Sequence, residues 1–282
     1  MKKSKIIIPA LAVLTLSTAA AVSGTVAWFT ASRTANVGVT STVINPEGEL
    51  QVKTVAGKAT AISGNAGIVM ATNSALRDAS VDAASVPGSI KAYSPKFDGE
   101  GVVTGYNDVT SADTTIAAVG NPATNYTVHY YATFQVEFTV PSADANAKFD
   151  VYFNETESEC NEDEPAAIQN AYRVAMYQGS ELCVWAPLRS TSVTYVNGTG
   201  ASATGTYTLA SGAISTASKT TAQADNKYLG TIEGTDKLTV NFVVWYDGLD
   251  ASCITSNLGT LVTDTCGYTM NFQAINQTDY LA

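Results

Sequence analysis

The stretch that decides the fold is Tyr126-Thr-Val-His-Tyr-Tyr-Ala-Thr-Phe-Gln-Val-Glu-Phe-Thr-Val140. Apolar side chains, most of them large, stand at every second position of this stretch, and the positions between them are mainly polar. A period of two is typical of a β-strand that has one buried face. The pattern therefore predicts one half-buried strand over residues 126–140.

The same alternation recurs in three other segments of the chain. Their apolar positions are Phe149, Val151 and Phe153; Leu238, Val240, Phe242 and Val244; and Tyr268, Met270, Phe272 and Ala274. Several half-buried strands predict a sandwich, because each must bury its apolar face against another layer. We therefore expect an all-β, jelly-roll-like β-sandwich with at most short helices.

One segment fits either a helix or a strand. Residues 166–177 follow Pro165 and an acidic turn, which favours a short helix because proline suits a first helical position. The run Arg173-Val-Ala-Met-Tyr177 equally fits a strand. The sequence leaves both alternatives open.

The composition agrees with a β-rich extracellular protein. The chain of 282 residues is 45% hydrophobic and only 14% charged, and Gly, Ser, Thr and Ala are abundant. Its formal net charge is -10, which makes nucleic acid and anionic membrane surfaces poor partners. We expect one domain over residues 46–282. Two polar tracts, near 56–125 and 190–226, are interpreted as insertions or mobile loops.

The N-terminus has the features of an export signal. Three lysines precede an apolar run from Ile6 to Val22, and the small residues Thr25-Val-Ala27 follow. Cleavage after Ala27 would make Trp28 the new N-terminus, so residues 1–27 are predicted to be a signal peptide that contacts the membrane only before cleavage. An uncleaved anchor is the alternative, although the run is slightly short of the roughly 18 strongly apolar residues of a span.

The segment after the leader, residues 28–45, has the pattern of a strand that is freed by cleavage. Beginning at Trp28, one face of this strand would carry Phe29, Ala31, Ala35, Val37, Val39 and Val43. Arg33 and Ser41 interrupt the stripe. Such a strand could pair within its own domain or with the sheet of the next subunit, and the second arrangement would produce a fibre.

The four cysteines, Cys160, Cys183, Cys253 and Cys266, fit an oxidising compartment. Three connectivities are possible. We expect the pairs Cys160–Cys183 and Cys253–Cys266, because each would close a local excursion between strands. A zinc site is the weaker alternative, since no pair has short ligand spacing and His129 is far away in sequence.

Candidate binding residues are sparse. Asp247 and Asp250 flank Gly248 in a predicted turn, where turn formation is the first interpretation and binding of a cation such as calcium the second. The acidic segment from Glu155 to Glu164 could also bind calcium, since hard cations take several carboxylate oxygens, but it lacks the spacing of a calcium loop. A solvated run of charges is therefore its first interpretation, and we expect no cofactor. His129 is assigned to the polar face of its strand, without a chemical role.

Two tryptophans invite a comparison with carbohydrate-binding surfaces. Trp185 and Trp245 each follow apolar residues, and we expect them in the sandwich core or at its rim. A carbohydrate-stacking role would require an exposed, coplanar pair of aromatic rings.

Both ends of the chain resemble the TasA and camelysin group of secreted bacterial proteins. The leader motif is Gly24-Thr-Val-Ala-Trp28, and the second likeness is the run Val243-Val-Trp-Tyr-Asp-Gly-Leu-Asp-Ala-Ser-Cys253. The resemblance implies a jelly-roll subunit that a dedicated signal peptidase cleaves. It also implies that the subunit polymerises into biofilm-matrix or cell-surface fibres by donating its N-terminal strand to a neighbour.

These observations predict a secreted structural protein of a bacterial matrix or cell surface. Its expected partners are further copies of itself in a head-to-tail homopolymer, the signal peptidase and a minor anchoring subunit. A monomeric surface adhesin or carbohydrate-binding module is the main alternative. A camelysin-type peptidase is a weaker one, because one histidine cannot supply a His-Glu-x-x-His motif and no Gly-x-Ser-x-Gly motif lies near it. We therefore expect no enzymatic activity.

Overall fold

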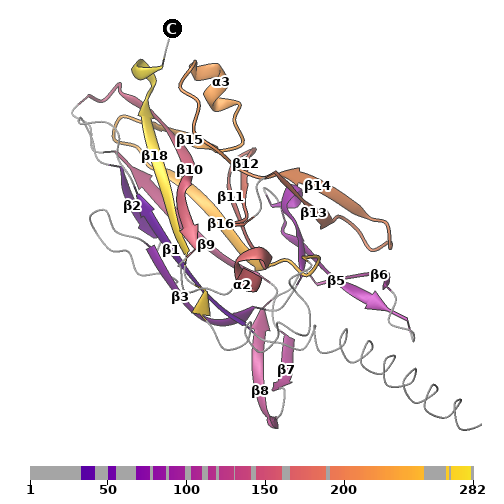
Figure 1. The fold of residues 1–282 in the computed structure, drawn as a ribbon. Coiled ribbons are helices and arrows are strands. Elements are labelled where there is room, and N and C mark those ends of the chain that lie inside the picture. The colour runs from indigo at the N-terminus through magenta and orange to yellow at the C-terminus, as the bar shows by residue number, and fades with distance from the viewer. Residues whose placement is uncertain are drawn as a thin grey trace, which may run out of the picture.

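The computed structural model describes most of the chain after residue 33 (Figure 1). The described residues are 33–41, 50–54, 68–76, 79–86, 89–98, 103–109, 114–118, 121–129, 131–140, 144–160, 166–188, 191–250, 265–266 and 268–280.

Two β-sheets form the body of the protein. The first sheet runs in the order β15 (Tyr228–Glu233), β10 (Lys148–Cys160), β18 (Tyr268–Asn276), β1 (Arg33–Ser41), β3 (Ile68–Leu76), β8 (Asn121–His129) and β7 (Thr114–Ala118), and β17 (Thr265–Cys266) also pairs with β1. The second sheet runs in the order β12 (Glu181–Trp185), β11 (Tyr172–Gln178), β16 (Leu238–Tyr246), β9 (Ala132–Thr139) and β2 (Gln51–Thr54).

The chain passes repeatedly from one sheet to the other, as in a jelly roll. Consecutive strands β8, β9, β10 and β11 alternate between the sheets, and β15, β16 and β18 do the same. The predicted all-β sandwich is therefore confirmed. The α-helices in the described part of the chain are short: α2 covers Ala166–Ala171 and α3 covers Lys219–Gln223. Among the described residues, no helix has the length and apolar character needed to cross a membrane.

Alternating side chains from both sheets fill the main core, as their spacing predicts. Phe149, Val151 and Phe153 of β10 are buried, and so are the apolar positions predicted in β16 and, from β18, Met270, Phe272 and Ala274. The ring of Phe272 on β18 lies 4.9 Å from that of Phe138, between ring centroids, and thereby joins the two sheets. These aromatic contacts add to the free energy gained by removing apolar surface from water.

The stretch that predicted one strand over residues 126–140 is in fact two strands in different sheets. β8 ends at His129 in the first sheet, and β9 begins at Ala132 in the second. In β9, Phe134, Val136 and Phe138 are buried while the residues between them are more exposed. The prediction of a single strand was wrong because the alternation in the sequence continues without a break from β8 into β9, so it does not mark the crossing between the two sheets.

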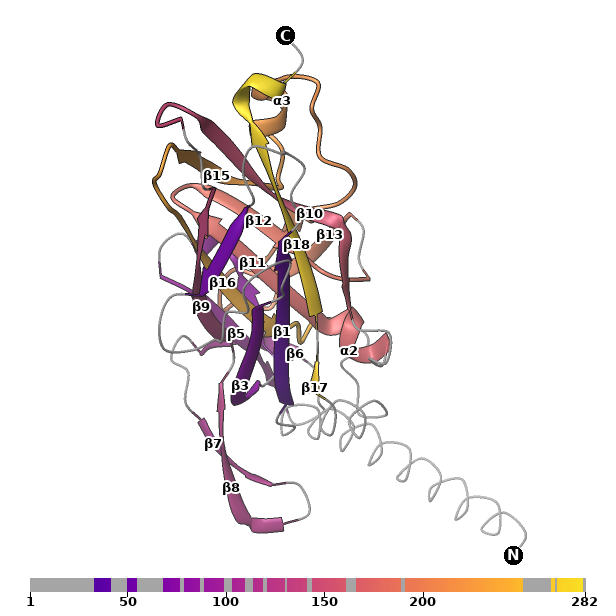
Figure 2. The ribbon, with the colours of Figure 1, turned by 90° about the vertical axis from the view of Figure 1, so that its left-hand side faces the viewer.

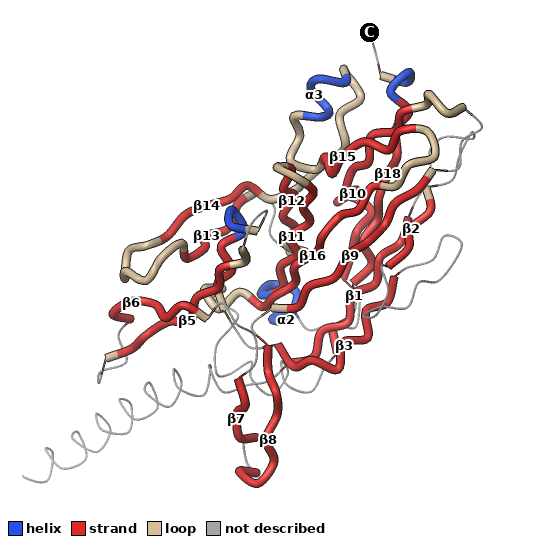
Figure 3. Tube along the Cα trace, turned by 180° about the vertical axis from the view of Figure 1, so that it is seen from behind, coloured by secondary structure: helices blue, strands red, loops and turns tan. Residues whose placement is uncertain are grey.

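Of the two interpretations of the polar tracts, insertions or mobile loops, their described residues fit insertions, because they form strands and a short helix. The first holds β3 and the three-stranded sheet of β4 (Ser80–Asp82), β5 (Lys91–Phe97) and β6 (Val103–Asp108). The second holds α3 and the hairpin of β13 (Ser192–Val196) and β14 (Thr204–Thr208). Figures 1 and 3 show the hairpin and β5–β6 beside the second sheet.

The β4–β5–β6 sheet and the β13–β14 hairpin are called the additions. A second, smaller core explains why they are ordered. Val184, Val243 and Trp245 lie on the outer face of the second sheet, and Val81 and Val193 from the additions pack against them. Many of the remaining members are alanines, whose small side chains give a weak hydrophobic signal in the sequence. The additions therefore form a third layer over the second sheet.

Residues 166–177, for which the sequence left a helix and a strand open, contain both. Helix α2 ends at Ala171, and β11 begins at the next residue, Tyr172. From Tyr172 to Met176 every residue of β11 is buried, because one face of the strand meets the main core and the other meets the second core. Burial on both faces removes the polar alternation that would have marked the strand.

We predict that Phe272→Ala lowers the free energy of unfolding by about 3–5 kcal/mol. Phe272 is fully buried, and its ring lies within 6.2 Å of that of Phe242 and within 5.8 Å of that of Phe153, between centroids. Urea unfolding followed by tryptophan fluorescence measures the change. The exposed variant Thr206→Ala is the control, and equal midpoints for the two variants would contradict the assigned core.

Candidate functional site: the N-terminal strand and its surroundings

The first described element, β1, occupies an interior position of the first sheet. Figure 2 shows it between β18 and β3. It pairs with β18 in parallel, with Gly38 opposite Thr269 and Ser41 opposite Phe272. On its other side it pairs with β3 in antiparallel, with Arg33 opposite Leu76 and Val39 opposite Ile68. The strand therefore has a hydrogen-bonding partner along both of its edges.

The register agrees with the face predicted for this strand. Val39 lies opposite Met270 of β18, and Met270 belongs to the main core. Because opposite residues share a face of the sheet, Ala35, Val37 and Val39 are at positions on the core side. Of the other predicted members, Ala27, Trp28, Phe29, Ala31 and Val43 lie outside the described residues, so the cleavage site and the ends of the arm stay predictions.

Removing β1 would leave a gap in the middle of the sheet. The edges of β18 and β3 would lose backbone partners, and an unpaired, buried N–H or C=O group costs roughly 1–3 kcal/mol. The first sheet would also be split, because β3, β8 and β7 reach β18 only through β1 in the strand order. Occupation of this position, by this strand or an equivalent one, is therefore required for the complete sheet.

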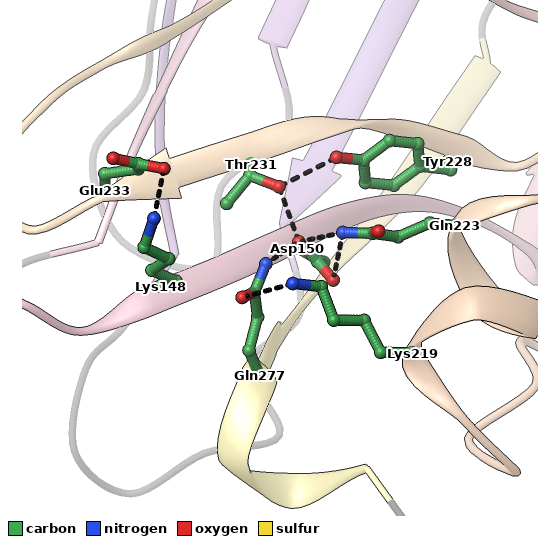
Figure 4. Close-up of polar contacts among 8 residues, drawn as sticks. All are labelled: Lys148, Asp150, Lys219, Gln223, Tyr228, Thr231, Glu233 and Gln277. Carbon is green, nitrogen blue, oxygen red and sulfur yellow. Dashed lines mark hydrogen bonds and ion pairs between the residues drawn. The ribbon is translucent and has the colours of Figure 1, made fainter.

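A polar cluster around Asp150 lies at the C-terminal end of β18 (Figure 4). Asp150 of β10 is fully buried, and its carboxylate accepts hydrogen bonds from Gln223 (3.0 Å), Thr231 (2.6 Å) and Gln277 (2.8 Å). The hydroxyl of Tyr280 also donates to it, at 2.9 Å. The donors come from α3, β15, the turn Gln277–Asp279 and the residue after it.

The donors to Asp150 are held by further contacts. Lys219 donates to Oε1 of Gln277 at 2.8 Å, and the hydroxyls of Tyr152 and Tyr280 are 2.6 Å apart. Burial raises the pKa of both tyrosines, so their hydroxyls stay protonated at neutral pH. The cluster therefore attaches α3 and the chain beyond β18 to β10. The sequence gives a weak signal for it: Asp150 occupies an outward position between the buried residues Phe149 and Val151.

We predict that Asp150→Asn destabilises the fold by about 2–4 kcal/mol. The amide NH₂ group would face donors and could accept none of their hydrogen bonds, which leaves buried polar groups without partners. Thermal unfolding measures the loss, and Asp236→Asn, at an exposed turn, is the matched control. Equal melting temperatures for the two variants would contradict the role assigned to Asp150.

The predicted cation ligands Asp247 and Asp250 instead bind an arginine. Nη2 of Arg173 lies 2.9 Å from Oδ2 of Asp250 and 3.3 Å from Oδ2 of Asp247, and all three side chains are buried. Arg173 also donates to the carbonyl oxygens of Asn170 and Tyr172. The predicted turn is present, since the N–H of Leu249 donates to Oδ1 of Asp247.

The Arg173 guanidinium therefore occupies the place that a metal ion would take between these two carboxylates. Across the described residues, no group of three or more His, Cys, Asp and Glu side chains is placed to hold a metal ion. The suggestion of metal ligation by Asp247 and Asp250 is corrected accordingly. Sequence spacing could not reveal this arrangement, because Arg173 is 77 residues away from Asp250.

This ion cluster contains two carboxylates, Asp247 and Asp250, and one guanidinium, Arg173. Burial raises the pKa of Asp247 to about 6, while the neighbouring Arg173 guanidinium lowers it and Asp250 raises it further. The folded chain thus holds the Asp247 proton more tightly than the unfolded chain, whose carboxyl has the ordinary pKa of 3.8. The free energy of unfolding therefore falls as pH rises from 3.8 to about 6.

We predict that Asp247→Asn flattens this pH dependence. Between pH 5 and pH 7 the wild type should lose on the order of 1 kcal/mol more stability than the variant, because the amide cannot ionise. Denaturant unfolding across this range measures the difference. Asp236→Asn should retain the wild-type profile, and a parallel profile for Asp247→Asn would contradict the raised pKa.

The cysteines depart from the predicted pairing. Cys183 of β12 is a free thiol, fully buried in the main core, so the predicted Cys160–Cys183 disulfide does not form in this structure. Burial raises the pKa of the Cys183 thiol far above its usual range, although Lys227 opposes the shift. Cys253 lies outside the described residues, so its predicted bond to Cys266 stays a prediction.

Trp185 and Trp245 lie inside the protein. Trp185 is packed in the main core against Phe153, and Trp245 is in the second core. Their exposed fractions are 1% and 0%, so they offer no surface on which a sugar ring could stack. Their predicted place in the core is confirmed.

No family model and no curated protein matches this chain. The features that bear on its function are therefore the sequence motifs and the position of β1.

Proposed function

We propose that this protein is a secreted structural subunit that polymerises into extracellular, biofilm-matrix or cell-surface fibres through its N-terminal strand. The observation that carries the proposal is the interior position of β1 between β18 and β3. The strand follows the predicted cleavage site within a few residues, so export and strand release would be coupled.

The position of β1 suits exchange between subunits. β1 pairs with β18, the last strand of the sandwich, so its ladder joins the two ends of the chain. A copy of β1 from another subunit would make the same backbone hydrogen bonds in the same register. Because the donated strand and the accepting position are different surfaces, the contact is heterologous, and its repetition gives an open filament.

The place between β18 and β3 also explains why each subunit would donate one strand. An unoccupied place between β18 and β3 would expose two strand edges, which invite pairing with other chains. A donated strand closes both edges and leaves the subunit's own strand for the next copy. The filament would therefore be polar, with a free strand at one end and an open position at the other.

We predict that protein beginning at Trp28 forms filaments that excess peptide 28–43 shortens in proportion to its concentration. The peptide would fill the position between β18 and β3 and end the chain. Negative-stain electron microscopy measures filament length. A peptide carrying Val37→Asp is the control and should have no effect, because it places a charge on the core side of the sheet.

Two results would contradict the proposal. Filaments whose length does not respond to the peptide would show that assembly uses another surface. Monodisperse particles at several concentrations and pH values would favour the monomeric adhesin in place of a fibre subunit.

A further inference from the structure

The sheet topology brings two of the four cysteines together. Cys160 is the last residue of β10 and lies opposite Tyr268 of β18. Cys266 precedes Tyr268 by two residues, and the register along β1 is continuous, with Ala35 opposite Cys266 and Gly38 opposite Thr269. Cys266 thus continues the line of β18, and Cys160 is its diagonal neighbour on the same face of the sheet.

The spacing of this diagonal is close to that of a disulfide. Diagonal neighbours in antiparallel strands have Cα atoms about 7–8 Å apart. Disulfides join Cα atoms up to about 6.8 Å apart, so a movement of about 1 Å is needed. Cys160 is the last residue of β10 and Cys266 is the last residue of β17, so a shift of this size breaks few backbone hydrogen bonds of the ladders.

Cys183 is excluded as a disulfide partner because it is buried. Cys183 is a free thiol within the core, which leaves Cys160, Cys253 and Cys266. We propose that the mature protein carries a disulfide between Cys160 and Cys266. This bond competes with the Cys253–Cys266 pair, which was predicted from closeness in sequence and not from the sheet.

The bond forms by ordinary thiol–disulfide exchange. The thiolate of one cysteine attacks an oxidised thiol–disulfide oxidoreductase or small disulfide and forms a mixed disulfide. The second thiolate displaces it, so the protein loses two electrons and two protons and the oxidant leaves as two thiols. Export supplies the compartment in which such oxidants act.

The bond would strengthen one side of the β1 position. It would join β10 to β17, and β17 pairs with β1 through Thr34 and Ala35. The parallel side of the position would then stay in place whether or not β1 occupies it. The bond itself does not depend on fibre formation, and its test has a chemical readout.

Peptide mapping tests the pairing directly. Protein beginning at Trp28 is refolded with oxidised glutathione, its free thiols are blocked with N-ethylmaleimide at low pH, and it is cut by a protease that cleaves before aspartate. Such cleavage places Cys160 in fragment 150–162, Cys253 in fragment 250–263 and Cys266 in fragment 264–278. We expect fragments 150–162 and 264–278 to be joined and the fragment with Cys253 to be blocked. A link to fragment 250–263, or no link, would overturn the proposal.

Serine variants extend the test to stability. Cys160→Ser and Cys266→Ser should each lower the melting temperature by at least about 5 °C, because the bond closes a loop of roughly 100 residues. Cys253→Ser is the matched control and should keep both the bond and the wild-type melting temperature. A fall for Cys253→Ser that equals the fall for Cys266→Ser would overturn the proposal. The mapping is done on the wild type, so it decides the question even where a variant fails to fold.

Discussion

The structure depends on filling one strand position in the middle of the first sheet. Among the described strands, β18 and β3 do not pair with each other, and β1 lies between them and pairs with both. The same position lies over the main core, because β1 is in register with core residues of β18. The strand that fills this position must therefore supply backbone partners along both edges, in register with core residues of β18.

The other parts of the sandwich are held by contacts that do not involve β1. The Asp150 cluster attaches α3 and the C-terminal turn to β10, and the Arg173 cluster fixes the turn after β16. The additions cover the outer face of the second sheet through their own core. A body with these separate attachments is the kind of scaffold that the proposed exchange of one strand between subunits requires.

The sequence predicted those features that depend on local spacing. The alternation around Phe149 and Phe272 gave strands and a sandwich, because a half-buried strand has a period of two whatever it packs against. It failed at the crossing between β8 and β9, where two strands of equal period follow each other. It also failed in the additions, where alanines replace large apolar side chains. The partners of Asp150 and Arg173 come from distant parts of the chain, so no spacing could identify them.

The most direct test of the account is to ask whose β1 occupies the position in a filament. A copy with a photo-crosslinking phenylalanine analogue at Thr40, which lies opposite Asn271, is mixed in equal amounts with a copy labelled with ¹⁵N. After assembly and irradiation, the account predicts that position 40 is joined to fragment 264–278 of light and heavy mass in equal amounts. Filaments in which it is joined only to the light fragment would show that each subunit keeps its own strand, and would contradict the account.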